Sequence, residues 1–263
     1  MKKVLASTLG LVGLVAALGA LAPGADTLHI VTQRDKPVYE ILRRIQEVYH
    51  WRIAYEDGPF LAEQSLVPKA SPTGRVMFGR PIRSVSFDLP PLVDNLAETK
   101  RSTMTAVFEA CRRAGNSEQF RVFEDFGYIN VVQAKIVGTD GRLEDFEPLL
   151  DTKVTLPRQR YLLYDLVSSI INQVSAARHI PIAMATIPTS LFLNVSTTEE
   201  ASSEPARKIL MRAFEAINGP RLSRGGSRLR LTWDLLYDDT EREYFFNVDG
   251  VDAEIEPPGP TAK

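Results

Sequence analysis

Cysteine and histidine are scarce in this sequence. The 263 residues include one cysteine, Cys111, and three histidines, none of which has a second His or Cys close by. A single cysteine excludes an internal disulfide framework and any Cys-x-x-Cys redox or metal motif. Isolated histidines give little from which to build a metal cage. The sequence therefore predicts no metal and no cofactor, and Cys111 is predicted to be a buried structural thiol.

An excess of charge of one sign is also absent. Lys and Arg total 31 and Asp and Glu total 33, which gives a net charge of −2. A nucleic-acid-binding protein usually carries a basic surplus, so we predict no nucleic-acid partner. The phosphate-binding, serine-nucleophile and zinc-protease motifs are missing too. The composition, 44% hydrophobic and 24% charged, is that of a globular protein, and we predict one that is not an enzyme.

The N-terminus has the order of an export signal. A basic start precedes an uncharged run over Val4–Ala22, and small residues follow at positions 22–25. This order predicts a signal peptide over residues 1–25, cleaved after Gly24 or Ala25, and a periplasmic or secreted protein. The run nearly reaches the ~20 residues that span a bilayer, so an uncleaved membrane anchor is the alternative. No later run approaches that length, and we predict no transmembrane domain after cleavage.

Two segments of the chain share one helical pattern. Apolar residues recur at helical spacing over 38–49 and again over 162–174, and a short strand pattern follows each. A histidine, His50 or His179, stands between helix and strand in both. We predict that each histidine lies at a helix C-terminus, where a cation or hydrogen-bonding group is favourable, and that neither ligates a metal.

A second pair of helices is closer in sequence. Residues 103–111 align with 209–217 and share Phe-Glu-Ala, so Phe108 and Phe214 are predicted to be equivalent buried residues. Two strand patterns follow each helix and one strand opens each half. The sequence thus predicts an α+β fold of two tandem small units, each with two helices packed on a short mixed β-sheet.

The boundaries follow from this alignment. The first unit is predicted over 26–137, a linker over 138–150, the second unit over 151–252 and a disordered tail over 253–263. The histidine and the shared phenylalanine are 58 residues apart in the first half and 35 in the second. We assign the excess to an inserted loop at 58–84, rich in Pro, Gly and Ser.

Basic residues without acids mark two stretches. Between Glu63 and Asp88, and between Glu215 and Asp234, there is no acidic residue. The cations there are Lys69, Arg75, Arg80, Arg83, Arg221, Arg224, Arg228 and Arg230. On a net-acidic protein such a surface favours anionic partners, and arginine suits forked contact with carboxylates. These eight residues are the candidate partner contacts, and we predict that Arg75, Arg80, Arg221 and Arg224 contribute to partner capture while adding little to stability; plain solvated surface is the alternative.

The order of elements resembles the secretin and TonB short N-terminal domain. The resemblance rests on the apolar stripe at 38–45, the strand Arg52–Tyr55, the segment Val85–Leu89 and the closing strand Tyr128–Val132. In the second unit, residues 191–195 are predicted to take the place of the central strand. It covers about 80 residues of each unit, and phrases such as 150–157 and 235–238 also resemble exported bacterial proteins. The resemblance implies a periplasmic module that contacts partner proteins and has no catalytic activity.

The sequence thus favours an exported cell-envelope protein that binds or scaffolds an envelope protein. Two alternatives remain open. One is an envelope enzyme with a site between the two units, built from a set such as His50, Glu56 and Asp57. The other is a membrane-tethered assembly factor that keeps its first apolar segment. The identity of the partner and the oligomeric state are not predicted.

Overall fold

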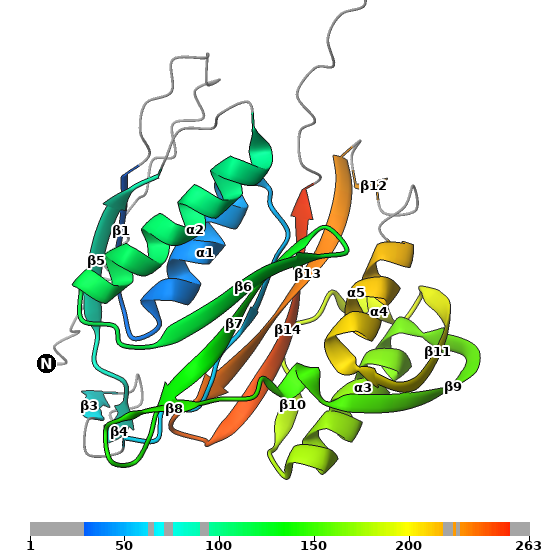
Figure 1. Cartoon of the computed structure of the whole chain (residues 1–263). Coiled ribbons are helices and arrows are strands. Elements are labelled where there is room, and N and C mark those ends of the chain that lie inside the picture. Colours follow the sequence, from blue (N-terminus) through cyan, green and yellow to red (C-terminus); the bar gives the residue numbers. More distant parts are fainter. Residues whose placement is uncertain are drawn as a thin grey trace, which may run out of the picture.

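A computed structural model describes residues 29–62, 66–70, 76–89, 95–217, 223–224 and 227–252. The predicted signal peptide at 1–25 and the predicted tail at 253–263 lie outside these residues. The fold is mixed α/β, with helices and several sheets (Figure 1).

Elements of the first half run from residue 29 to residue 137. In chain order they are β1 (His29–Arg34), α1 (Pro37–Tyr49), β2 (Ile53–Glu56), β3 (Val67–Ala70), β4 (Val76–Gly79), β5 (Arg83–Asp88), α2 (Leu96–Arg113), β6 (Gln119–Asp125) and β7 (Tyr128–Val137).

The remaining elements begin with β8 (Leu143–Asp145) and a 3-10 turn at Leu149–Asp151. After these come β9 (Lys153–Leu162), α3 (Leu163–Arg178), β10 (Ile182–Met184), α4 (Thr189–Phe192), β11 (Ser196–Pro205), α5 (Ala206–Ile217), β12 (Ser223–Arg224), β13 (Ser227–Asp238) and β14 (Glu243–Asp252).

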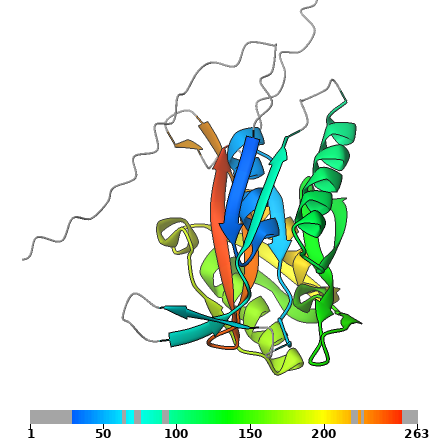
Figure 2. The same cartoon turned by 90° about the vertical axis from the view of Figure 1, so that its left-hand side faces the viewer.

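Strand pairing follows one scheme in both halves. In the first half β1 pairs antiparallel with β5, β2 runs parallel to β7, and β7 pairs antiparallel with β6. In the second half β9 pairs antiparallel with β11, β10 runs parallel to β14, and β14 pairs antiparallel with β13. Figure 2 shows β1 and β5 side by side in front of α1.

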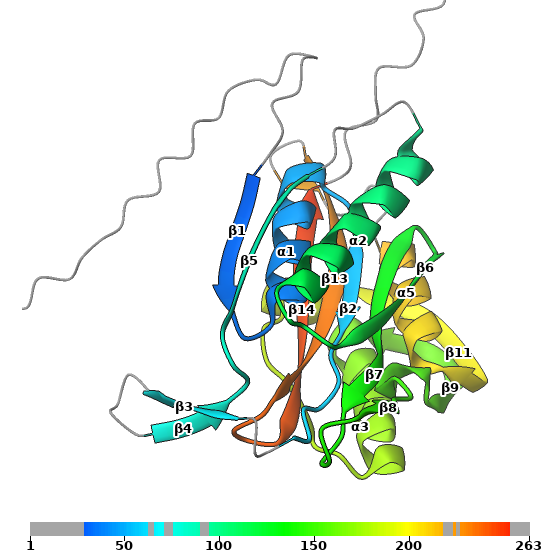
Figure 3. The ribbon, with the colours of Figure 1, turned by 60° about the vertical axis from the view of Figure 1, so that its left-hand side comes forward.

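A single sheet crosses both halves. Strand β13 runs parallel to β2, which gives the continuous order β10-β14-β13-β2-β7-β6. Helices α1 and α2 cover one face of this sheet, and α3 and α5 cover the other (Figures 1 and 3). Side chains of β2 alternate accordingly, since Ile53 and Tyr55 belong to one buried cluster and Ala54 to the other.

Local sequence explains how the repeated helices end. Pro37 occupies the first turn of α1, where its missing N–H is not needed. Both α1 and α3 end at a histidine in the left-handed conformation, with φ of 55° at His50 and 54° at His179. The backbone N–H of each histidine donates to the carbonyl four residues earlier, at Gln46 or Ser175. The prediction that both histidines lie at helix C-termini is confirmed.

Three local predictions need correction. The segment 58–84 is not simply a loop, because β3 and β4 pair as an antiparallel hairpin within it. The predicted linker 138–150 contains β8, and its Leu149 and Leu150 are completely buried in the cluster that includes residues of α3 and α5. Residues 191–195, predicted as a strand, span the end of the short helix α4 and the turn after it.

The two shared phenylalanines differ in burial. Phe214 of α5 is completely buried and meets the ring of Phe192 edge-on at 6.3 Å. Phe108 of α2 is only partly buried and stacks on Phe120 at 5.6 Å. The prediction of equal burial is therefore wrong, and the cause is that β6, beside Phe108, is an edge strand, whereas the corresponding β13 is covered by β2.

Candidate functional site

Those of the eight predicted contact residues that the structure describes do not form one surface. Arg75 and Arg221 lie outside the described residues, and for Arg224 and Arg228 only the backbone is described, in the β12–β13 hairpin. The β3–β4 hairpin and the β12–β13 hairpin lie at opposite ends of the molecule (Figure 1). The two basic stretches therefore cannot act as a single patch on one partner group.

The other four predicted residues have different environments. Lys69 on β3 forms an ion pair with Asp35, which precedes α1. Arg83 is partly buried, and its Nη1 donates to the carbonyl of Ala114 at 3.4 Å. Arg230 is partly exposed on β13. Arg80 has no exposed surface to offer, because it is 2% exposed.

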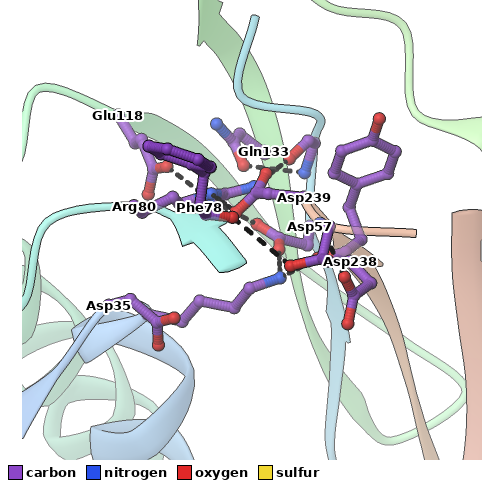
Figure 4. A network of polar contacts seen from close by, with 12 residues as sticks. Asp35, Asp57, Phe78, Arg80, Glu118, Gln133, Asp238 and Asp239 are labelled. Carbon is purple, nitrogen blue, oxygen red and sulfur yellow. Dashed lines mark hydrogen bonds and ion pairs between the residues drawn. The ribbon is translucent and has the colours of Figure 1, made fainter. Parts of the chain in front are cut away.

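Arg80 is the centre of a buried ion network (Figure 4). Its Nη1 donates to Asp57 at 3.2 Å and to Glu118 at 2.8 Å, and its Nε donates to Asp239 at 3.0 Å. Its Nη2 donates to the carbonyl of Gly58 at 2.7 Å. The guanidinium therefore has acceptors on every side, and the prediction that Arg80 contacts a partner is wrong for a physical reason: three carboxylates already hold it inside the protein.

Charge balance around Asp57 sets the electrostatics of this network. Lys36 also binds Asp57 and the carbonyl of Tyr237. Burial alone would raise the pKa of Asp57, but the charges of Arg80 and Lys36 outweigh it and hold that pKa below its ordinary value. For Glu118 and Asp239 burial dominates over the attraction of Arg80, so their pKa values are raised.

The network connects segments that are far apart in sequence. Its carboxylates come from the end of β2, the α2–β6 connection and the β13–β14 turn. A hollow beside it, lined in part by Phe60 and Ser117, has a volume of about 20 Å³, which holds about one water molecule. The arrangement works as a clamp between the two halves, and this small hollow has no room for an organic substrate.

A second buried pair lies across the sheet. Arg207 of α5 binds Glu56, and its Nε donates to Asp151 at 3.0 Å. Glu56 and Asp57 are both completely buried, on opposite faces of the sheet. His50 precedes β2, at the other end of that strand. The structure does not bring the set His50, Glu56 and Asp57 into one cleft.

Cys111 lies in the interior of the first half. Cys111 is 2% exposed within the cluster under α1 and α2, which confirms its predicted burial. Burial raises the pKa of its thiol to about 12, so the nucleophilic thiolate is disfavoured.

Within the described part of the chain, no cluster of three or more His, Cys, Asp or Glu residues is arranged to hold a metal ion. None of the helices described is long and apolar enough to cross a membrane.

An open groove lies between α2 and β6, and the sequence did not point to it. Its volume is about 380 Å³. Its floor and walls include the apolar side chains Met104, Phe108, Val122 and Ile129, with Lys100 and Arg101 of α2 at its rim. Strand β6 is the last strand of the sheet, so on its outer side the backbone groups of alternate residues have no strand partner among the described residues.

Comparison with known proteins gives no relative for this chain. No protein-family model matches the sequence, and neither a curated protein nor a solved structure is significantly similar to it. The resemblance to the secretin and TonB short N-terminal domain therefore stays a prediction.

Proposed function

We propose that this chain is an exported, non-catalytic protein-binding module of the cell envelope, built from two fused copies of one strand-helix unit, and that it binds partners by receiving an extended strand at β6. The first support is the strand pairing, since each half pairs its strands by the same scheme. The second is that both first helices end at a left-handed histidine.

Register relates the two hairpins residue by residue. Asp125 and Tyr128 form the last pair before the turn of β6–β7, and Asp238 and Glu243 form the last pair of β13–β14. Val122 lies three residues before the end of β6, and Leu235 lies three residues before the end of β13, so the two positions correspond. This counting uses backbone pairing alone and is independent of the sequence alignment of the helices.

The observation that carries the proposal is the contrast between these two positions. Leu235 is completely buried, and its carbonyl accepts a hydrogen bond at 2.9 Å from the N–H of Asp57, which directly follows the neighbouring strand β2. Val122 is 37% exposed and lines the groove between α2 and β6. The first half thus carries the same receiving edge as the second, but none of the described strands occupies it.

Helices α2 and α5 give independent support. In the helix alignment, Arg101 corresponds to Arg207 and Glu109 to Glu215. In α5, Arg207 binds Glu56 and Glu215 binds Arg52, so two charged residues of the helix contact the segment that holds β2. In α2, Arg101 and Glu109 are both exposed. A strand added to β6 would therefore find an arginine and a glutamate placed to bind it.

Strand addition explains why binding needs no catalytic group. Main-chain hydrogen bonds at the sheet edge supply affinity, and side-chain contacts with the groove supply specificity. The envelope location rests on the signal peptide predicted at the N-terminus. Mass spectrometry tests it: protein from the periplasm should begin at Ala25 or Asp26, whereas recovery only from membranes with Met1 retained would establish the uncleaved anchor.

A peptide that copies residues 50–57 tests the docking edge, because it contains the strand that fills the equivalent place in the second half. We expect the labelled peptide to bind the purified chain saturably in a fluorescence anisotropy titration. Val122→Lys should weaken binding about tenfold or more, since a lysine at an edge opposes strand addition. Val31→Lys is the matched control, because Val31 is 60% exposed on β1, away from the groove.

Exchanging the charges of Arg101 and of the peptide tests the contact between the peptide and α2. Arg101→Glu should weaken binding of the peptide, and a peptide in which the glutamate at the position of Glu56 is replaced by arginine should bind this variant better than it binds the wild type. The proposal is wrong if the peptide does not bind, or if Val122→Lys binds it as well as Val31→Lys does.

A further inference from the structure

We propose that the strand received at β6 belongs to a second copy of this chain, whose β10 adds parallel to β6 and thereby links molecules head to tail. This inference rests on the proposed function, because it names the occupant of the same edge. It uses the sheet edge and not the helix charges, since Pro181 and Ala185 stand where β2 has Arg52 and Glu56. The contact would repeat between molecules the joint that β2 and β13 form within one molecule.

Strand β10 has the same place in its half as β2 has in the first. Both begin three residues after the histidine that ends a helix, at Ile53 and at Ile182. Both run parallel to the last strand of their half, and each of these isoleucines pairs with the second residue of that strand, Ile129 or Tyr244. Strand β2 uses its other side to bind β13, whereas β10 is the terminal strand of the described sheet.

The sheet face beside β10 is also incompletely covered. In the joint between β2 and β13, Ala54 of β2 packs into the core of the second half, and Asn130 of β7 donates to Met211 of α5 at 3.5 Å. The positions corresponding to these two residues are Ala183 on β10 and Phe245 on β14. Both are only partly buried, and Phe245 packs against neither core cluster. Among the described residues, one molecule therefore has an incompletely covered helix face at one end and an incompletely covered sheet face at the other.

Direction of the strands fixes the kind of assembly. In the first half, β7 and β2 run in one direction and β6 runs opposite to them. In the second half, β13 runs in the direction of β2, whereas β14 and β10 run in the direction of β6. Passing from one half to the next therefore reverses the strands and moves the helices to the other face (Figure 3). Such a contact is heterologous, because it joins β10 to β6 and not like to like, and it does not close on a pair. The expected product is an open row of molecules with one continuous sheet.

Sedimentation velocity over a range of concentrations tests the inference on the purified exported chain. We expect the average sedimentation coefficient to rise with concentration and to pass the value of a dimer without a plateau. Val122→Lys should remove this rise by blocking β6, and Ala183→Arg should remove it by blocking the face beside β10. Val31→Lys should associate as the wild type does, and unchanged melting temperatures establish that the variants are folded.

Mixing the two blocked variants distinguishes a head-to-tail contact from any symmetric one. Val122→Lys keeps a free β10 and Ala183→Arg keeps a free β6, so the mixture should form a one-to-one dimer that grows no further. Cysteines at Val122 in one copy and Ala185 in the other should form an intermolecular disulfide, since the joint places Leu235 opposite Glu56. A cysteine at Leu193, which is 51% exposed, should not.

Failure of this inference is separate from failure of the proposed function. If the chain stays monomeric and the mixed variants do not pair, while the residue 50–57 peptide still binds at Val122, then β6 receives a strand from another protein and self-association is overturned. If the peptide also fails to bind, both proposals are wrong. A dimer that Val122→Lys does not affect overturns the assignment of the contact to β6.

Discussion

Glu56 and Asp57 are consecutive residues at the end of β2, and their carboxylates bind two different buried arginines on opposite faces of the sheet. Glu56 binds Arg207 of α5, and Asp57 binds Arg80 next to β4. All four side chains are at most 3% exposed. A strand places successive side chains on opposite faces, so one dipeptide connects α5 on one face of the sheet with the β4–β5 connection on the other.

Removal of Arg80 should destabilise the protein strongly. Arg80→Met leaves Asp57, Glu118 and Asp239 buried without their shared cation, and loss of one partner from a buried ion pair typically costs about 3–5 kcal/mol. Urea unfolding should report this loss. The control is Arg44→Met, because Arg44 is 59% exposed in its pair with Glu47 and such pairs contribute about 0–1 kcal/mol. Equal stability of the two variants would contradict the clamp.

Asp234 should make the protein less stable as pH rises. Burial raises the pKa of this carboxyl to about 6, from an ordinary value of 3.8. Tyr39 and Arg43 of α1 and Asn247 and Asp249 of β14 surround it. Between these two pKa values the folded state binds more protons than the unfolded state, so its contribution to the free energy of unfolding falls as pH rises towards 6. At neutral pH the ionised group then costs about 3 kcal/mol.

Replacement of Asp234 tests this sign. Asp234→Asn keeps an acceptor for Asn247 and removes the titration, so the free energy of unfolding of this variant minus that of the wild type should rise between pH 4 and about 6 and level off above pH 7. Urea unfolding at a series of pH values measures both effects. Asp145→Asn, at a carboxylate that is 92% exposed, should leave the wild-type profile unchanged. A difference between variant and wild type that stays constant or falls as pH rises from 4 to about 6 would refute the interpretation.

Alanine at the two shared phenylalanines should have unequal effects. Phe214→Ala removes a completely buried ring and should cost about 3–5 kcal/mol. Phe108→Ala removes a ring that already borders the open groove, so its cost should be smaller, about 1–2 kcal/mol. Chemical denaturation of both variants measures the difference. Equal losses would mean that the groove beside Phe108 is filled in solution.

Cys111 should not react with a thiol reagent in the folded protein. The side chain is 2% exposed, and burial raises its pKa to about 12; reagents attack the thiolate. A colorimetric thiol assay should detect no reaction in buffer and one equivalent of thiol after denaturation in urea. Rapid labelling without denaturant would show that the cluster under α1 and α2 opens readily.

Helices and hairpins were predictable because their signals are local. Apolar spacing indicates α1, α2, α3 and α5, and alternation indicates β6–β7 and β13–β14. Even the register of the β6–β7 hairpin is set nearby: Phe126 and Gly127 both have positive φ, as a tight two-residue turn requires. These elements need no information from the rest of the chain.

Contacts between distant segments were not predictable in this way. The partners of Arg80 come from Asp57, Glu118 and Asp239, separated by up to 182 residues in sequence, and a basic stretch without acids is typical of a solvated loop. The pairing of β2 with β13 leaves no periodic signal, because it is made by backbone groups. For the same reason Val122 and Leu235 look alike in sequence although only one is covered.

The pairing of β2 with β13 also orders events during synthesis. The hydroxyl of Thr232 donates to the carbonyl of Ile53 across 179 residues of sequence, so this side of β2 has no partner until almost the whole chain has been made. Contacts of such long sequence separation make folding slow. The proposed export would gain from this delay, because the first half cannot complete its sheet before the last strands have been made. Limited proteolysis of chains truncated before residue 227 should find that half readily cleaved.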